Sequence, residues 1–259
     1  MVGRAPNRLA PSLADIRGRG PAMTSTPAMS GEASTDTAIA THGLGREYGD
    51  TTALHPTDFV VPSGQRIALV GHNGSGKTTL IRMLAGLLDP SSGSADIGGH
   101  VAGSVGARSA LSYLADQPIF YDDLSVLEHL EYVARLHGRD TWTDAADDLL
   151  ERFALTDRAD HLPSTFSRGL RQKAAICLAF VRPIAVLVVD EPFVGLDSVG
   201  RDELMGLFDD AHELGKTVLV ATHELTTVAA SERVVALREG QVAYDGSPDT
   251  DLDSLVEGT

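Results

Sequence analysis

The sequence has little cysteine, lysine or aromatic content, and it has no long hydrophobic run. Its single cysteine, Cys177, excludes an internal disulfide and lies in the apolar stretch AAICLAF, where it is predicted to be a small buried side chain of a cytosolic protein. The best membrane-span candidate, residues 174–189, is interrupted by Arg182-Pro183 and falls short of the roughly 20 apolar residues that a spanning helix needs. The sequence therefore predicts no membrane span of its own.

Basic residues are also scarce. The chain has 21 Lys and Arg against 36 Asp and Glu, a formal net charge of −15, and only three lysines: Lys77, Lys173 and Lys216. An acidic surface argues against general nucleic-acid binding, because contacts to a phosphate backbone need a basic patch. A single nucleotide is not excluded, since it needs only a local site.

The first 36 residues differ in composition from the rest. They are rich in Pro, Ser, Thr, Gly and Ala, with four arginines in the first nineteen positions and no continuous apolar core. This composition is typical of a disordered tail rather than a secretory signal, and Met23 or Met29 is an alternative start. Residues 37–259 are predicted to form a single domain.

Periodicity beyond the tail predicts an α/β fold. Short alternating runs from Ala38 favour several short strands, whereas residues 118–178 show helical spacing. The runs IALV, AVLVVDEP and TVLVATHE are almost purely apolar, which suits strands buried on both faces of a parallel sheet. Function is then expected at the carboxyl ends of these strands. A helix from Lys77, with Leu80, Met83, Leu84 and Leu87 on its apolar face, is predicted to stop at Asp89-Pro90.

The stretch GHNGSGKTTL follows the first buried strand. Gly71, Gly76, Lys77 and Thr78 match G-x-x-x-x-G-K-[ST] in full, between a strand and a helix. Glycines let backbone N–H groups point at phosphates, Lys77 would neutralise the β- and γ-phosphates, and the Thr78 hydroxyl would hold Mg²⁺. The simpler interpretation is a glycine-rich turn with an incidental lysine, which the complete pattern disfavours. The predicted nucleotide contacts are Gly71, His72, Asn73, Gly74, Ser75, Gly76, Lys77, Thr78 and Thr79.

Two carboxylates end the second buried strand, VLVVDEP. Asp190 would hold Mg²⁺, usually through water, and Glu191 would orient or deprotonate an attacking water as the catalytic base. Taken alone, exposed acids at a strand end are the better explanation, but the phosphate loop reverses that preference.

Three further residues have both a structural and a functional interpretation. Ser167 in FSRGLRQK could simply cap a helix, yet Ser167 with Gly169 at a helix start also forms an anion site. His223 in ATHE could be structural or could donate to a γ-phosphate as a catalytic residue. Tyr48 in REYGD could pack against the protein or stack on a base.

The order of these motifs resembles the nucleotide-binding subunit of ATP-binding-cassette (ABC) transporters over about residues 38–248. Residues 71–78 match the Walker A motif of this family, residues 186–191 match Walker B, and residues 166–173 match the signature. Tyr48 matches the adenine-stacking loop, Asp197 matches the D-loop and His223 matches the switch histidine. The resemblance implies a P-loop NTPase fold of the RecA-like type. That fold has a parallel-sheet core, a small N-terminal antiparallel β subdomain, and a helical subdomain inserted at about 118–178.

The sequence departs from the family pattern in two places. The signature is usually Leu-Ser-Gly-Gly-Gln; here Arg168 replaces the first glycine and Leu170 the glutamine, although Ser167 and Gly169 remain. In the Q-loop, Asp116 occupies the glutamine register and Gln117 lies one place later. We prefer Gln117 as the nucleotide and metal contact, because an aspartate would add negative charge beside the phosphates.

The resemblance also implies partners. Two subunits, identical or not, would sandwich two ATP molecules, each held by the phosphate loop of one chain and by Ser167 and Gly169 of the other. A separate transmembrane permease would bind this subunit at the cytoplasmic face of the membrane and would convert ATP hydrolysis into transport. Residues 121–138 look most like those of exporters. The alternative is a soluble ABC ATPase acting in translation or DNA repair. A single cassette without a coiled-coil insertion disfavours it.

Overall fold

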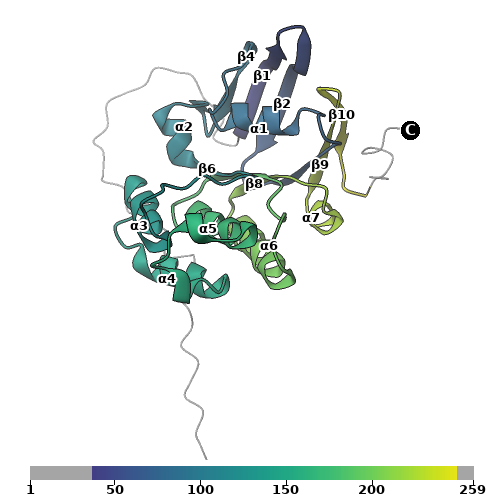
Figure 1. The fold of residues 1–259 in the computed structure, drawn as a ribbon. Helices are drawn as coiled ribbons and strands as arrows, with labels where there is room; N and C mark the ends of the chain where they lie inside the picture. The colour runs from purple at the N-terminus through teal and green to yellow at the C-terminus, as the bar shows by residue number, and fades with distance from the viewer. Residues whose placement is uncertain (1–36, 250–259) are drawn as a thin grey trace, which may run out of the picture.

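The computed structural model describes residues 37–249, so the predicted N-terminal tail and the alternative starts lie outside the described residues. Two sheets form the framework: a six-stranded sheet of order β10-β9-β3-β8-β7-β6 and a four-stranded sheet of order β2-β1-β4-β5. In Figure 1 the larger sheet runs across the middle of the molecule. Helices α1 and α2 and the smaller sheet lie on one side of it, and α3 to α6 lie on the other. The predicted α/β class is confirmed.

The three apolar runs form adjacent parallel strands in the larger sheet. β3 pairs with β8, and β8 pairs with β7, while β6 and β9 extend the parallel part on either side. Alternate residues of β7 enter opposite cores, with Leu187 and Val189 on the helical side and Val186 and Val188 on the other. Burial on both faces explains the continuous apolarity. The strands are β3 (Arg66–Val70), β6 (Leu111–Leu114), β7 (Val186–Asp190), β8 (Thr217–Ala221), β9 (Arg233–Arg238) and the antiparallel β10 (Gln241–Gly246).

The N-terminal sheet is antiparallel, as expected, but its strands are longer than the alternation indicates. β1 (Thr37–Tyr48) and β2 (Thr51–Pro62) have 12 residues each and pair along their length. The register shifts between Thr41 and Leu44, where Gly43 has a φ of 56°. Glycines that resemble turns in the sequence therefore mark irregularities within one strand. β4 (Ser92–Ile97) and β5 (His100–Val101) complete this sheet.

Helix α1 (Lys77–Leu84) ends earlier than predicted. Leu80, Met83 and Leu84 are buried as expected, but Gly86 has a φ of 68° and its N–H donates to the Met83 carbonyl, so the chain leaves the helix there. A left-handed glycine ends a helix more readily than a proline four residues later. Leu87, which the sequence pattern placed on the core face, is consequently 65% exposed.

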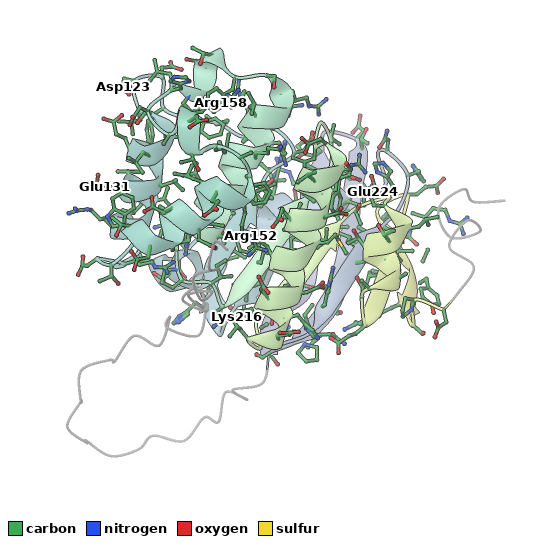
Figure 2. All side chains as sticks on the ribbon, turned by 90° about the horizontal axis from the view of Figure 1, so that it is seen from below. Asp123, Glu131, Arg152, Arg158, Lys216 and Glu224 are labelled. Carbon is green, nitrogen blue, oxygen red and sulfur yellow. The ribbon has the colours of Figure 1, made fainter. Side chains whose placement is uncertain are left out.

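The middle of the chain is helical, as predicted. Ser125 and Glu128 form a capping box at the start of α3, and Leu130, Phe153 and the thiol-bearing Cys177 are fully buried in one core. Arg152 on α4 pairs with Glu203 and Asp210 on α6, at 2.9 and 3.1 Å, and ties this helical subdomain to the sheet-covering helix; Figure 2 labels Arg152 there. The helices are α2 (Val105–Ala110), α3 (Val126–Leu136), α4 (Thr143–Arg152), α5 (Arg168–Phe180), α6 (Ser198–Glu213) and α7 (Leu225–Ala229).

Within residues 37–249, none of the helices has the length and apolar character required to cross a bilayer.

Leu130 offers a test of the helical subdomain. Leu130→Ala removes a fully buried side chain of α3 and should lower the free energy of unfolding by about 2–5 kcal/mol, because it leaves a cavity. Leu136→Ala on the same helix is the control: its side chain is 65% exposed, so a change within about 0.5 kcal/mol is expected. Urea unfolding followed by circular dichroism measures both, and equal effects would contradict this packing.

Candidate functional site

The phosphate loop, residues 71–76, connects the buried end of β3 to the start of α1. Gly71 and Gly76 have φ angles of 148° and 105°. A Cβ atom on Gly71 would lie 2.3 Å from the Leu237 carbonyl oxygen, and one on Gly76 would lie 2.7 Å from that of Ala53. These two positions therefore accept only glycine, and the motif has the strand–loop–helix context that a phosphate cradle needs.

Lys77 is buried inside this loop. Its Nζ donates to the carbonyl oxygens of Gly71, at 2.6 Å, and of His72, at 3.3 Å. Burial lowers the pKa of Lys77, while the carboxylates of Glu191 and Asp190 act in the opposite direction. The ammonium group is thus bound by the loop's own carbonyls and lies within electrostatic range of Asp190, which ends β7, and of Glu191, which follows it.

Asp190, the last residue of β7, is only 2% exposed. Burial raises its pKa, and the charge of Asp116 raises it further, whereas the Thr78 hydroxyl and Lys77 lower it. Its Oδ1 atom is buried and has no hydrogen-bond partner among the described residues. A buried oxygen without a partner is costly, so this atom is suited to a ligand that supplies one.

The donor set fits Mg²⁺. Asp190 and Thr78 offer oxygen atoms, which this cation prefers. Over residues 37–249 no cluster of three or more His, Cys, Asp or Glu side chains could hold a metal by itself. Magnesium is typically bound by one or two carboxylates together with substrate phosphates, and Asp190 beside the phosphate loop matches that arrangement.

Glu191 and His223 form a pair at the mouth of the loop. The Oε2 atom of Glu191 lies 2.9 Å from Nδ1 of His223, and the Glu191 backbone N–H donates to the Ala221 carbonyl of β8. Burial raises the pKa of Glu191, whereas His223 and Lys77 lower it. Glu191 has a φ of 46°, an unusual backbone conformation for a non-glycine residue that is often found at functional sites. A carboxylate oriented by a neighbouring histidine is the arrangement of a general base.

Tyr48, the predicted base-stacking residue, is 49% exposed at the end of β1. The guanidinium of Arg46 lies 4.6 Å from the centre of its ring. The β1–β2 hairpin also reaches the phosphate loop: His55 N–H donates to the Gly240 carbonyl, and Gly240 N–H donates to that of Ser75. Arg46 was not predicted from the sequence, although residues i and i+2 of a strand share a face, so its place beside Tyr48 could have been expected.

The signature residues lie at the start of α5. Ser167 is the N-cap, and its Oγ accepts the Leu170 N–H at 3.4 Å, so its capping role is confirmed. A Cβ atom on Gly169 would meet the Gly195 carbonyl oxygen at 2.4 Å, which requires glycine at this helix position. Their predicted contacts to phosphate need a second subunit and stay predictions.

Asp197, the predicted D-loop residue, is bound close to the signature. It accepts the Gly200 N–H as N-cap of α6 and pairs with Lys173 of α5 at 3.0 Å. Lys173, and then the Gly200 N–H, lower the pKa of Asp197, so this side chain is ionised at neutral pH. The signature helix and the D-loop therefore form one packed unit.

In the Q-loop the structure gives Asp116, and not Gln117, a charged partner, while the nucleotide and metal contact expected of Gln117 stays a prediction. The carboxylate of Asp116 lies 3.4 Å from the Arg168 guanidinium, and its negative charge contributes to the raised pKa of Asp190. Gln117 is exposed, and its side chain makes no hydrogen bond within residues 37–249. Repulsion by the phosphates disfavours Asp116 only while its charge is unpaired, and Arg168 is the cation that lies beside it.

Comparison with known proteins agrees with this geometry. A family model described as ABC transporter matches residues 54–194, more than half of the chain. The ABC-type transporter ATP-binding protein EcsA of Bacillus subtilis (strain 168) is 33% identical over 205 residues, covering 77% of this chain and 83% of EcsA. The macrolide export ATP-binding/permease protein MacB of Rhodopseudomonas palustris (strain BisB18) is 36% identical over 82% of this chain, but the chain spans only 34% of MacB.

Solved structures show the same fold. A structure described as the ATP-binding subunit of an ABC transporter has a TM-score of 0.79 and 29% identity, covering 85% of this chain and 98% of that subunit. The ATP-binding cassette MJ0796, in a dimeric post-hydrolysis state with ADP and phosphate, has a TM-score of 0.74 at 23% identity, over 82% of this chain and all of that chain. The chain described here belongs to the ABC transporter family and is an ATP-hydrolysing nucleotide-binding subunit of that family.

Proposed function

We propose that this subunit hydrolyses Mg²⁺-bound ATP within a dimer and thereby drives a separate membrane-spanning exporter subunit at the cytoplasmic face of the membrane. One observation carries the proposal. Lys77, Asp190 and the Glu191–His223 pair converge on a single glycine-lined phosphate loop.

The residues present divide the reaction between them. ATP phosphates would replace the Gly71 and His72 carbonyls as partners of the Lys77 ammonium, whose charge they match better. Thr78 and Asp190 would hold Mg²⁺, which would neutralise negative charge at the phosphates. Glu191 accepts a proton from water as the water oxygen bonds to the γ-phosphorus. The bond from that phosphorus to the bridging oxygen breaks, and its electron pair leaves with ADP.

His223 has a positioning role in this scheme. With its Nδ1 protonated, it donates to Glu191 and fixes the carboxylate at the mouth of the loop. Its side chain is 69% exposed, so its other ring nitrogen is accessible to a γ-phosphate or to a second subunit. Ser167 and Gly169, also at the surface of the helical subdomain, are suited to bind the ATP of that second subunit.

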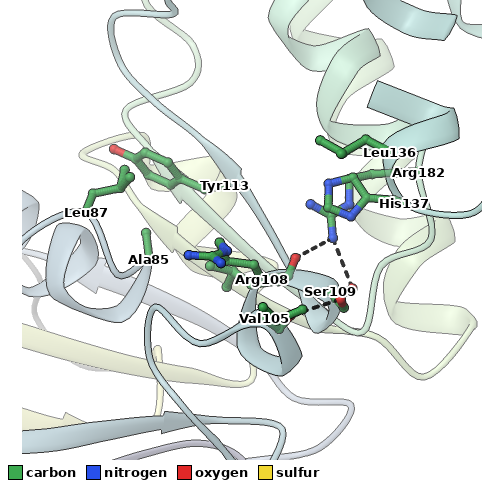
Figure 3. Close-up of a pocket in the computed structure, with 10 residues that line it drawn as sticks. Ala85, Leu87, Val105, Arg108, Ser109, Tyr113, Leu136, His137 and Arg182 are labelled. Atoms are coloured by element: carbon green, nitrogen blue, oxygen red, sulfur yellow. Dashed lines mark hydrogen bonds between the residues drawn. The ribbon is translucent and has the colours of Figure 1, made fainter. Parts of the chain in front are cut away.

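A groove beside α2 is the proposed docking surface for the membrane subunit. It has a volume of about 460 Å³, and the apolar side chains of Leu87, Val105 and Leu136 at its rim are each at least 65% exposed. Figure 3 shows Leu87 on one side, Leu136 on the other and Val105 below. Exposed apolar side chains gathered around a hollow are typical of a protein–protein contact.

The charges of the groove indicate what it binds. Although the chain is acidic overall, Arg108 and Arg182 line this hollow, and the Arg182 Nη2 donates to the carbonyls of Arg108 and Ser109 (Figure 3). Burial lowers the pKa of Arg182 to about 10, so it stays charged at neutral pH. Burial and Arg182 lower the pKa of His137 to about 4, so it stays neutral. We assign the groove to a cytoplasmic helix of the membrane subunit that carries an acidic residue among apolar ones.

The proposed export direction is supported by the name of one relative and by sequence resemblance, whereas another relative is named for import. MacB is named as an export protein, and residues 121–138 resemble exporters. The aliphatic sulfonates import protein SsuB 2 of Pseudomonas aeruginosa (strain UCBPP-PA14) is 33% identical over 80% of this chain. The cargo is selected by the membrane subunit in this proposal.

Lys77 provides the first test. Lys77→Ala removes the buried cation of the loop and should weaken ATP binding roughly ten- to a hundredfold, since a charged hydrogen bond contributes about 1.5–3 kcal/mol. Lys216→Ala, outside the site, is the control. Isothermal titration with ATP and magnesium measures the affinity. Parental affinity in the Lys77 variant would exclude this loop as the nucleotide site.

Glu191 provides the second test. Glu191→Gln keeps the shape of the side chain but cannot accept a proton, so turnover should fall by about 10²–10⁴ while ATP binding persists. The variant should then accumulate as an ATP-bound dimer on gel filtration. Glu213→Gln, at the end of α6, is the control. Hydrolysis at the parental rate would mean that another group is the base.

Val105 tests the groove. Val105→Glu places a negative charge on a 72% exposed side chain at the start of α2, where a carboxylate is compatible with the helix. The variant should therefore fold, but its charge should abolish docking by an apolar helix that carries an acidic residue. The measurement is ATPase stimulation by the membrane subunit of the proposed function, reconstituted with this chain in lipid vesicles. Val60→Glu, another exposed valine, is the control. Full stimulation of the Val105 variant would exclude the groove as the docking surface.

A further inference from the structure

Two departures from the family pattern contact each other in the structure. Asp116 stands in the register of the Q-loop glutamine, and Arg168 stands in place of the first signature glycine. The Arg168 Nη2 donates to the Asp116 Oδ1 at 3.4 Å, across 52 residues of sequence. An added negative charge in one loop is therefore matched by an added positive charge in the other.

This ion pair is weak enough to be exchanged. The Arg168 side chain is 64% exposed and that of Asp116 is 36% exposed. Exposed pairs typically contribute about 0–1 kcal/mol. A terminal phosphate carries more negative charge than a carboxylate and can accept two parallel N–H bonds from a guanidinium, so it is the stronger partner for Arg168.

The position of Arg168 favours a ligand outside its own chain. It is the first residue of α5, directly after the N-cap Ser167 and before Gly169, which packs on the Gly195 carbonyl. Backbone packing thus fixes the helix start, while the guanidinium extends into solvent next to the residues that the proposed function assigns to the partner's ATP.

A second contact, besides the Arg168–Asp116 pair, joins the Q-loop region to α5. Arg171, one turn further along α5, donates to the Pro118 carbonyl at 3.2 Å, and its guanidinium lies 5.7 Å from the centre of the Phe120 ring. This second connection holds the same loop without using Asp116. Arg171 is therefore a matched control, because it is a cation of the same helix that contacts the same loop.

We propose that Arg168 is a phosphate ligand acting in trans: Asp116 holds it in the ATP-free chain, and it transfers to the γ-phosphate of ATP on the partner subunit when the dimer closes. The inference rests on the dimer of the proposed function. It adds a cation to the Ser167 and Gly169 contacts, and it explains why an aspartate is tolerated in the Q-loop. That aspartate keeps Arg168 in place and offsets its charge until ATP arrives.

The test measures dimerisation rather than turnover. In the full chain carrying Glu191→Gln, analytical ultracentrifugation gives the ATP concentration at which half of the protein is dimeric. Arg168→Ala should raise that concentration at least tenfold and reduce its dependence on NaCl, because a cation–phosphate contact is lost. Asp116→Asn should lower it by up to about fivefold, since Arg168 is released from a pair of about 0–1 kcal/mol. Arg171→Ala should leave it unchanged.

A charge exchange separates a phosphate ligand from a structural link. The double variant Asp116→Arg, Arg168→Asp restores an ion pair, but a carboxylate at position 168 repels the phosphate, so dimerisation should stay impaired. Parental dimerisation in this double variant, or in Arg168→Ala, would overturn the inference while leaving the proposed dimer intact. Absence of an ATP-dependent dimer in the Glu191→Gln parent would overturn the proposed dimer and this inference together. Melting temperatures of all variants report whether they fold.

Discussion

The site depends on one electrostatic constraint, the buried ammonium of Lys77 opposite two largely buried carboxylates. Burial disfavours the charged form of all three groups. The two carboxylates stabilise the charged form of Lys77, and Lys77 in turn stabilises the charged form of each carboxylate. The lysine is bound by loop carbonyls, and one oxygen of Asp190 is without a partner among the described residues. Such a site suits a ligand with both negative oxygens and a bound cation, which is the chemistry of the magnesium nucleotide that we propose.

Strand order creates this constraint. β3, β8 and β7 are parallel neighbours, so the loops that follow them leave the sheet at the same edge. The phosphate loop follows β3, Asp190 ends β7 and Glu191 comes directly after it, and His223 follows β8. Because Glu191 is bonded through its backbone to Ala221, the base and its orienting histidine are held together by the sheet itself. The catalytic geometry is therefore a consequence of parallel pairing.

Helix α5 connects this edge to the rest of the molecule. Its buried Gln172 donates to the Pro192 carbonyl just after the two acids, Lys173 pairs with Asp197, and Arg168 reaches Asp116. The signature helix thus contacts the segments on both sides of the carboxylates. If a dimer closes on this helix, a shift of α5 would displace Asp190 and Glu191 directly, because α5 contacts the residue that follows them.

The sequence by itself determined the local features: the phosphate loop, the doubly buried strands, the Ser167 cap and the helical middle segment. Each depends on residues within a few positions of one another, where periodicity and glycine placement are sufficient. The sequence misplaced the end of α1 and the lengths of β1 and β2, because Gly86 and Gly43 have roles that only the surrounding backbone reveals. Only the tertiary structure decided that Asp116 faces Arg168 and that Glu191 meets His223. Those partners are 52 and 32 residues apart, and no local pattern encodes which distant side chain will neutralise a charge.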